Sequence, residues 1–207
     1  MTIERKFIEG SVIKLNISKF MEDALTKAGF SRVEIQRTPV LTRITAYVLN
    51  PGRVIGRSGK SINELTERIA KQFNIENPQI NVIEINDRML EPAIVANDIA
   101  YKIERSINPR KIIQRTLKNI FDNGALGAEI VISGKVAAKS ARKKKIRKSI
   151  GYIPKVGDVV SLVREGRATA YPKHGAIGIK VRIVPPGTVF PDRVIKKVEI
   201  PREISNS

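Results

Sequence analysis

Two glycines three residues apart, Gly56 and Gly59, punctuate the chain between the hydrophobic pair Val54-Ile55 and an amphipathic helix pattern. Glycine reaches backbone angles that are closed to other residues, and it lets a second backbone approach closely. The helix that follows would point its unpaired N–H groups and the positive end of its dipole at the turn. This pattern predicts a tight turn that can hold a phosphodiester, with Arg57 and Lys60 as flanking cations.

Three interpretations of this turn compete. Gly59-Lys60-Ser61 ends like a nucleotide-binding P-loop, whose G-x-x-x-x-G-K-[ST] pattern requires glycine at position 54. That position is Val54, so the loop would be too tight to wrap a β-phosphate, and nucleotide hydrolysis ranks last. A Gly-x-x-Gly clamp, as in KH modules that grip a short single strand, ranks first, ahead of a tight turn without a ligand. The predicted RNA-binding loop then consists of Gly56, Arg57, Ser58, Gly59 and Lys60.

The order of the elements predicted around the turn supports the clamp. Helical and alternating hydrophobic patterns predict a helix, two strands, the turn, a helix and a strand, closing near residue 87. Ser18 is the predicted N-cap of the first of these helices, and Gly29 is expected to end it. Ser61 and Glu64 match a capping box after the turn. The predicted elements are a weak amphipathic helix over 4–12, a helix over 18–28, strands over 31–37 and 41–49, a turn at 50–52, a helix over 61–73 and a strand over 79–86.

The second half of the chain predicts two helices followed by strands. Pro92 stands where proline often opens a helix, Asn108-Pro109 separates that helix from the next, and Gly124 ends the second. Strands are predicted over 129–133, in the basic stretch that follows, over 158–171, and over 175–184, where apolar and polar residues alternate strictly. The fold class is therefore α+β, divided into an N-terminal helix (1–16), an RNA-binding domain (17–87), a domain of two helices on an antiparallel sheet (92–185) and an extended tail (186–207).

The positive charge is concentrated in the second half. The chain holds 38 Lys and Arg against 20 Asp and Glu, a formal net charge of +18. Residues 1–90 carry 14 basic and 10 acidic side chains, whereas residues 91–207 carry 24 and 10. So large an excess repels itself in a free chain, and a polyanion is the compensating partner. The densest run, predicted to bind RNA phosphates rather than to form only a solvated face, contains Lys139, Arg142, Lys143, Lys144, Lys145, Arg147 and Lys148.

A second set of cations lies on the predicted helix after Pro109. They recur every three to five residues, so several share one helical face opposite the apolar side that carries Ile113 and Leu117. Such a stripe can follow an RNA strand, although a merely solubilising face would have the same pattern. The residues of this stripe are Arg110, Lys111, Arg115 and Lys118.

The composition excludes several other classes of site. Cysteine is absent and His174 is the single histidine, so we predict no catalytic residue, no metal site and no cofactor. No apolar run approaches a membrane span and the N-terminus lacks the apolar core of a signal peptide, which predicts a cytoplasmic protein without membrane or small-molecule partners. Aromatic residues make up 5% with no Trp, so backbone electrostatics should outweigh base stacking.

The sequence also resembles a known family. The block Val54-Ile-Gly-Arg-Ser-Gly-Lys-Ser-Ile62, within a type II KH arrangement, is similar to the small-subunit ribosomal protein three family. The similarity continues in the same order through the segments 109–115, 127–135 and 175–182. The basic segment 140–149, followed by Gly157-Asp158, looks more like archaeal or eukaryotic members than bacterial ones.

This resemblance implies a non-catalytic structural constituent of the small ribosomal subunit. It implies binding to ribosomal RNA in the head of the subunit, contacts with neighbouring ribosomal proteins, and a position along the channel where messenger RNA enters. The helix with Arg110, Lys111 and Arg115 corresponds to one that presents cations to messenger in the family, but Gln114 stands where bacterial members carry a further cation. The alternative is a free-standing KH regulator that binds transcripts outside the ribosome.

Overall fold

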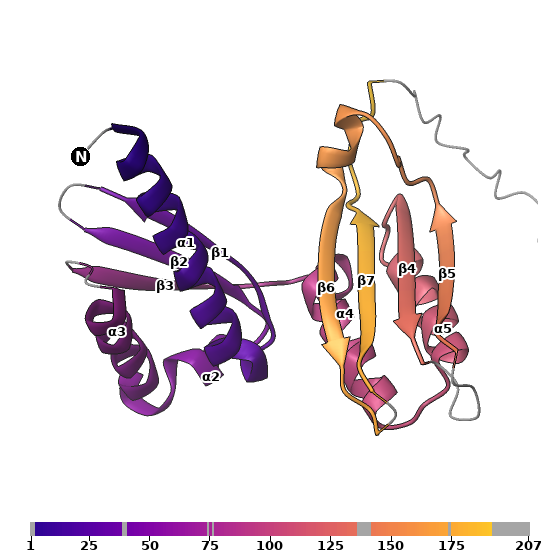
Figure 1. Cartoon of the computed structure of the whole chain (residues 1–207), viewed down its shortest axis with the longest axis horizontal. Helices are drawn as coiled ribbons and strands as arrows, with labels where there is room; N and C mark the ends of the chain where they lie inside the picture. Colours follow the sequence, from indigo (N-terminus) through magenta and orange to yellow (C-terminus); the bar gives the residue numbers. More distant parts are fainter. Residues whose placement is uncertain are drawn as a thin grey trace, which may run out of the picture.

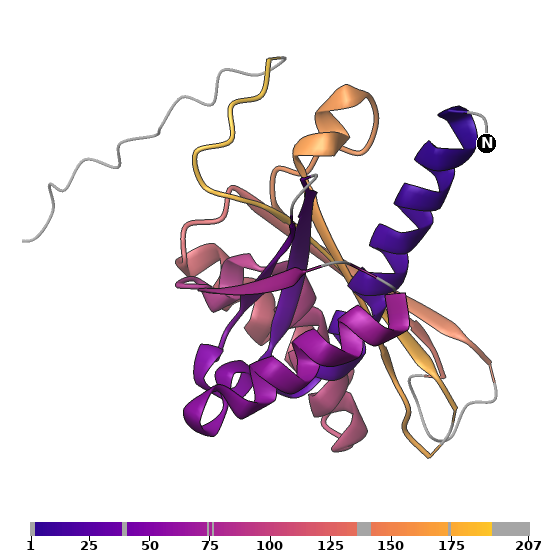
Figure 2. The same cartoon turned by 90° about the vertical axis from the view of Figure 1, so that its left-hand side faces the viewer.

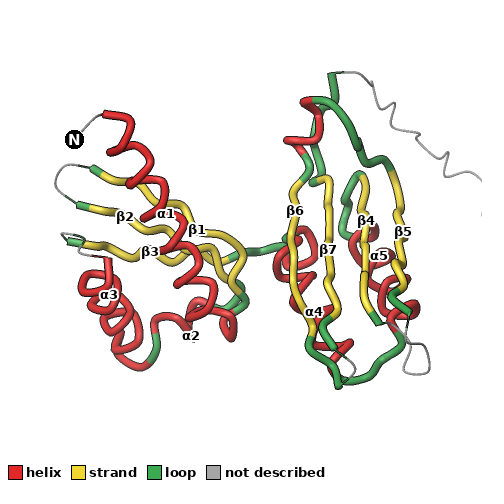
Figure 3. The backbone as a smooth tube through the Cα atoms, in the orientation of Figure 1, coloured by secondary structure: helices red, strands yellow, loops and turns green. Residues whose placement is uncertain are grey.

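The protein consists of two helix-and-sheet units that lie side by side (Figures 1 and 3). In the computed structural model, the described residues are 3–38, 41–73, 75, 77–135, 142–173 and 175–191. The first unit contains a three-stranded sheet and the second a four-stranded sheet. No helix in the described part of the chain is long and apolar enough to cross a membrane.

The first unit places its helices against one mixed sheet. Strand β2 is central, antiparallel to β1 and parallel to β3. Apolar side chains of α1, α2 and α3 pack with the strands in one core, which includes Met21, Ile44, Val54 and Ile69. The elements are α1 (Ile3–Leu25), β1 (Phe30–Arg37), β2 (Thr42–Val48), α2 (Pro51–Ile55), α3 (Lys60–Phe73) and β3 (Pro78–Glu84).

Three local predictions for this unit were wrong. Helix α1 runs without a break through Ser18, which therefore caps nothing, because Ile17, Met21 and Leu25 extend one buried stripe at steps of four. The predicted turn at 50–52 instead opens the short helix α2, which has proline in its first turn. Ser61 is the second residue of α3 rather than its cap. Gly29 does end the N-terminal helical segment, in a left-handed conformation with φ 76°.

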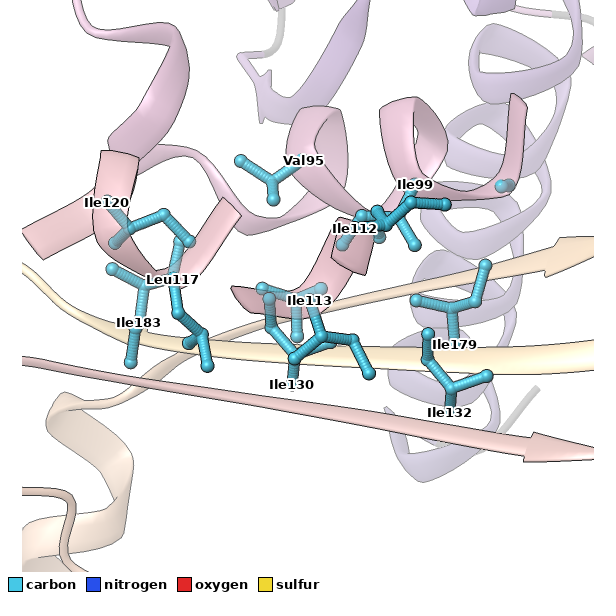
Figure 4. Packing of buried hydrophobic residues seen from close by; sticks show 14 of the residues in the cluster. Val95, Ile99, Ile112, Ile113, Leu117, Ile120, Ile130, Ile132, Ile179 and Ile183 are labelled. Atoms are coloured by element: carbon cyan, nitrogen blue, oxygen red, sulfur yellow. The ribbon is translucent and has the colours of Figure 1, made fainter. Parts of the chain in front are cut away.

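The second unit covers one face of an antiparallel sheet with two helices. The strand order is β5-β4-β7-β6; α4 packs on β6 and β7, and α5 packs on β4 and β5. Figure 4 shows side chains of both helices, among them Ile99 and Ile113, packed over Ile130 and Ile179 of the strands. The elements are α4 (Pro92–Glu104), α5 (Pro109–Asp122), β4 (Gly127–Gly134), β5 (Lys144–Gly151), β6 (Arg164–Ala170) and β7 (Ile177–Val184).

Two predictions for the second unit need correction. The strand predicted over 158–171 is a 3-10 helix, Asp158–Leu162, followed by β6, because local hydrogen bonds turn the chain: the Val160 N–H donates to the Gly157 carbonyl at 3.2 Å and Ser161 Oγ donates to the Asp158 carbonyl at 2.7 Å. The predicted tail begins as packed chain: Phe190 is 3% exposed, and its ring meets Tyr152 edge to face at 5.2 Å. The rest of that prediction, 192–207, lies outside the described residues, as do Lys139 and His174.

A buried carboxylate joins the two units. Glu91, just before α4, is 8% exposed and accepts hydrogen bonds from Ser31 Oγ (2.7 Å) and Arg164 Nη1 (2.8 Å). Arg32 Nη1 lies 3.4 Å from the same carboxylate, and its guanidinium stacks 4.2 Å over the Tyr47 ring. Glu91 thus connects β1 of the first unit to β6 of the second. Figure 2 shows both units with the first unit toward the viewer.

Candidate nucleic-acid interface

The Gly-x-x-Gly turn connects α2 to α3 through residues in unusual backbone conformations. Gly56 has φ 71° and ψ −174°, and its N–H donates to the Gly52 carbonyl at 3.0 Å, closing α2. Ser58 and Gly59 also have positive φ, 54° and 76°. A Cβ on Gly56 would collide with the Ser61 hydroxyl, so glycine is required there by both conformation and space.

The turn presents its polar side chains outward. Arg57, Ser58 and Lys60 are exposed, and neither cation pairs with an acidic side chain among the described residues. A hollow of about 220 Å³ lies alongside, lined by residues of α1, α2 and α3 that include Arg53, Ser61 and Arg68. Together they form an open, cationic surface next to a concavity, an arrangement that can receive a phosphodiester chain.

Helix α5 carries the predicted basic stripe on its solvent side. Arg110, Lys111, Arg115 and Lys118 are all exposed, as is Gln114 between them. The other side of the helix is buried against the sheet. The helix begins where the Asn108 side chain accepts a hydrogen bond from the Arg110 N–H at 3.0 Å. The four cations therefore face solvent together, and their binding role stays a prediction.

Strand pairing divides the dense basic run instead of leaving it as one patch. Arg142 and Lys143 precede β5 and are exposed. Within β5, side chains alternate, so Lys145 and Arg147 lie on one face of the sheet. Lys144 and Lys148 lie on the other face with Ile146 and Ile150, which pack against the core. The run thus contributes cations to two different surfaces.

The prediction missed the acidic residues that organise these cations. Glu129 on β4 has a side chain only 2% exposed; it accepts from Arg147 Nε and lies 3.4 Å from Arg182 Nη1. Arg147 therefore has a partner within the protein, which the sequence had not predicted. The available signal was a carboxylate inside the apolar strand pattern of 127–134.

A second carboxylate, Glu165 on β6, forms ion pairs with cations on the same side of the sheet as Glu129. It accepts from Arg167 Nε at 2.7 Å and lies 2.8 Å from Lys180 Nζ and 3.6 Å from Arg182 Nε. Burial alone would raise the pKa of the Glu165 carboxyl, but hydrogen bonds and charges from Lys180 and Arg167 bring that pKa below its ordinary value. Glu165 is therefore an ion-paired carboxylate at neutral pH.

The described residues contain no group of three or more His, Asp or Glu side chains that could hold a metal ion. The structure instead combines a Gly-x-x-Gly turn between two helices, a three-stranded mixed sheet, and exposed cations on the turn, on α5 and on β5. This combination defines a KH-type RNA-binding protein.

Comparison with known proteins specifies the family. The profile described as "KH domain" matches residues 16–90, and that described as "Ribosomal protein S3, C-terminal domain" matches residues 99–183. "Small ribosomal subunit protein uS3" of Methanocaldococcus jannaschii is 38% identical over 94% of this chain and 93% of its own. The proteins of the same name from Methanospirillum hungatei and Methanothrix thermoacetophila are 39% and 40% identical over 93% of this chain, covering 81% and 69% of their own. The chain belongs to the small ribosomal subunit protein uS3 family.

These matches confirm the resemblance, and the relatives named here are archaeal, in agreement with the archaeal or eukaryotic likeness of the basic segment. They also confirm the α+β fold class with a KH domain. They favour the ribosomal interpretation over the free-standing KH regulator.

Proposed function

We propose that this protein is a structural constituent of the small ribosomal subunit, binding ribosomal RNA in the head of the subunit. The observation that carries the proposal is the match over 94% of the chain to a relative named for that subunit, in a molecule of net charge +18. The protein works in the cytoplasm, as part of the ribosome, beside neighbouring ribosomal proteins. Its contribution is positional, and it catalyses no reaction.

The two units have different tasks in this proposal. The region 17–87 uses its Gly-x-x-Gly loop to hold single-stranded RNA, and the region 92–185 supplies most of the contacts with ribosomal RNA. The loop acts through Arg57, Lys60 and the amide groups at the start of α3. Each such contact is weak, so several must act together in the adjacent hollow.

Messenger RNA is the proposed ligand of the α5 stripe, which lines the channel where messenger enters. The support is geometric: Arg110, Lys111, Arg115 and Lys118 face solvent on one side of a helix whose other side is fixed by the core. Cations on a rigid helix can follow the phosphates of a moving strand without reading its sequence. The neutral Gln114 weakens the stripe at its centre.

If the basic run binds RNA, removing its cations should make the RNA affinity of the protein less dependent on salt. Replacing Arg142, Lys143, Lys144 and Lys145 by Gln should flatten the log–log dependence of RNA affinity on salt by about 0.7–0.9 of a slope unit per lost contact. The measurement is a titration of the full chain with small-subunit ribosomal RNA at several salt concentrations. A matched control replaces the exposed Lys14, Lys19, Lys71 and Lys102 by Gln. If the slope is unaltered, the four cations of the run face only solvent.

A further inference from the structure

The four-stranded sheet has one face without helices. Helices α4 and α5 pack on the side that carries Ala128, Ile130 and Ile132, and in Figure 1 they lie behind the strands. Side chains of the alternate residues point to the opposite side. We give the name open sheet face to twelve of the strand residues on that side and leave out the end row of Gly151, Gly127 and Val184, because Val184 is fully buried. The twelve are Lys145, Arg147 and Ser149 of β5; Glu129, Val131 and Ser133 of β4; Gly178, Lys180 and Arg182 of β7; and Glu165, Arg167 and Thr169 of β6.

The strand register arranges this face in rows that cross all four strands. One row pairs Arg147 with Val131, Val131 with Lys180, and Lys180 with Arg167, so three cations stand in a line across the sheet. With neighbouring strands about 4.8 Å apart, this line covers roughly 14 Å. The next row contains both carboxylates, Glu129 and Glu165. The cationic row therefore has an acidic row on one side only.

Each cation of the row contacts a carboxylate of the neighbouring acidic row. Arg147 donates through Nε to Glu129, while Arg167 and Lys180 contact Glu165 at 2.7 and 2.8 Å. The two terminal NH₂ groups of Arg147 have no partner among the described residues, and this side chain is 47% exposed. Cations that are already fixed lose less side-chain freedom when a ligand binds. The carboxylates thus orient the row while leaving donors available.

The chemistry of the face selects its occupant. Five cations stand against two carboxylates, so an excess of positive charge remains after all internal pairing. A protein partner would need an apolar centre, but Val131 is the one large apolar residue among the twelve. None of the twelve is aromatic, so unpaired bases find no surface on which to stack. Backbone phosphates of a double-helical RNA, whose bases are already stacked, match all three properties.

We infer that the open sheet face is a docking surface for the phosphate backbone of double-helical RNA, with Glu129 and Glu165 as positioning residues. The inference rests on the proposed function in that both take RNA as the ligand. It adds a separate surface with its own RNA class, since the Gly-x-x-Gly loop and the α5 stripe are proposed to hold single strands.

The test compares two double variants of the full chain. Lys145→Gln with Arg167→Gln removes two cations from the open sheet face; Lys145 has no described acidic partner, and Arg167 is 75% exposed. The control, Lys19→Gln with Lys102→Gln, removes the same charge from exposed positions on α1 and α4. Affinity is measured for an RNA duplex and for a single strand of the same length, and melting temperatures verify folding.

The sheet variant should lose duplex affinity by at least about tenfold at 0.1 M salt, because each lost phosphate contact corresponds to roughly 0.9 of a log–log slope unit. Its single-strand affinity should match that of the control. Equal duplex affinity of the two variants would overturn the inference while leaving the proposed function intact. The inference would also be overturned if the sheet variant bound the duplex normally but no longer co-sedimented with another protein of the subunit, because this face would then be a protein interface. A wild-type chain that binds neither RNA would contradict the proposed function itself.

Discussion

Replacing Arg57 and Ser58 by Asp should reduce the affinity for a short single-stranded RNA by about tenfold or more, since cations in such a contact each account for about 0.7 of a slope unit. The substitution changes the charge of this dipeptide from +1 to −2, a change of three units, where the turn is proposed to meet a phosphate. Folding should survive, because both side chains are exposed and Asp tolerates the left-handed conformation that Ser58 adopts, with φ 54°. Fluorescence anisotropy with the labelled strand measures the effect.

The chain offers a matched control for this substitution. Arg105 and Ser106 form the same dipeptide, both are exposed, and Ser106 also has a positive φ, 61°. Replacing this pair by Asp imposes the same charge change and the same backbone demand outside the proposed surfaces. The control also loses the stacking of Arg105 on Tyr101, which contributes about 0.5–1 kcal/mol at an exposed site. If both variants lose affinity equally, the turn is not a clamp.

Replacing both Arg147 and Arg182 by Met should lower the free energy of unfolding by about 3–5 kcal/mol, because it leaves the Glu129 carboxylate buried without a partner. The arginines themselves are partly exposed, so the uncompensated group is the carboxylate, which is 2% exposed. Urea denaturation of the full chain measures the change.

A triple variant separates this effect from simple loss of packing. Adding Glu129→Met to the two arginine substitutions removes the stranded charge and should recover most of the lost stability. If the triple variant is as unstable as the double, the cost arises from packing and not from the buried carboxylate.

The sequence predicted the fold well where the signal was local. The alternation of apolar residues at 177, 179, 181 and 183 is sufficient to define β7, and all four are buried. The Gly-x-x-Gly turn was likewise predictable, since the glycines allow backbone angles that few other residues adopt. Helix boundaries were less predictable: Ser18 has the chemistry of an N-cap, but the buried stripe of Ile17, Met21 and Leu25 carries α1 through it.

The candidate interface depended more on pairing between distant segments. Counting charges identified the basic run, but only the β4–β5 register shows that Lys145 lies on the open sheet face and Lys144 on the face with the helices. The partnership of Arg147 with Glu129 spans 18 positions and needs the register as well as the alternation. The packing of Phe190 on Tyr152 has no local pattern at all, which is why the segment was predicted to be an extended tail.

The most direct test of the central claim is RNA crosslinking inside intact particles. Small subunits containing this protein are isolated on a gradient, irradiated, and the crosslinked residues mapped. The protein should sediment with the small subunit and crosslink to RNA at the 56–60 loop, along the exposed side of α5 and in the 142–148 run. Recovery of the chain in light fractions, or particles in which none of these segments crosslinks to RNA, would contradict the claim that its excess positive charge is neutralised by ribosomal RNA.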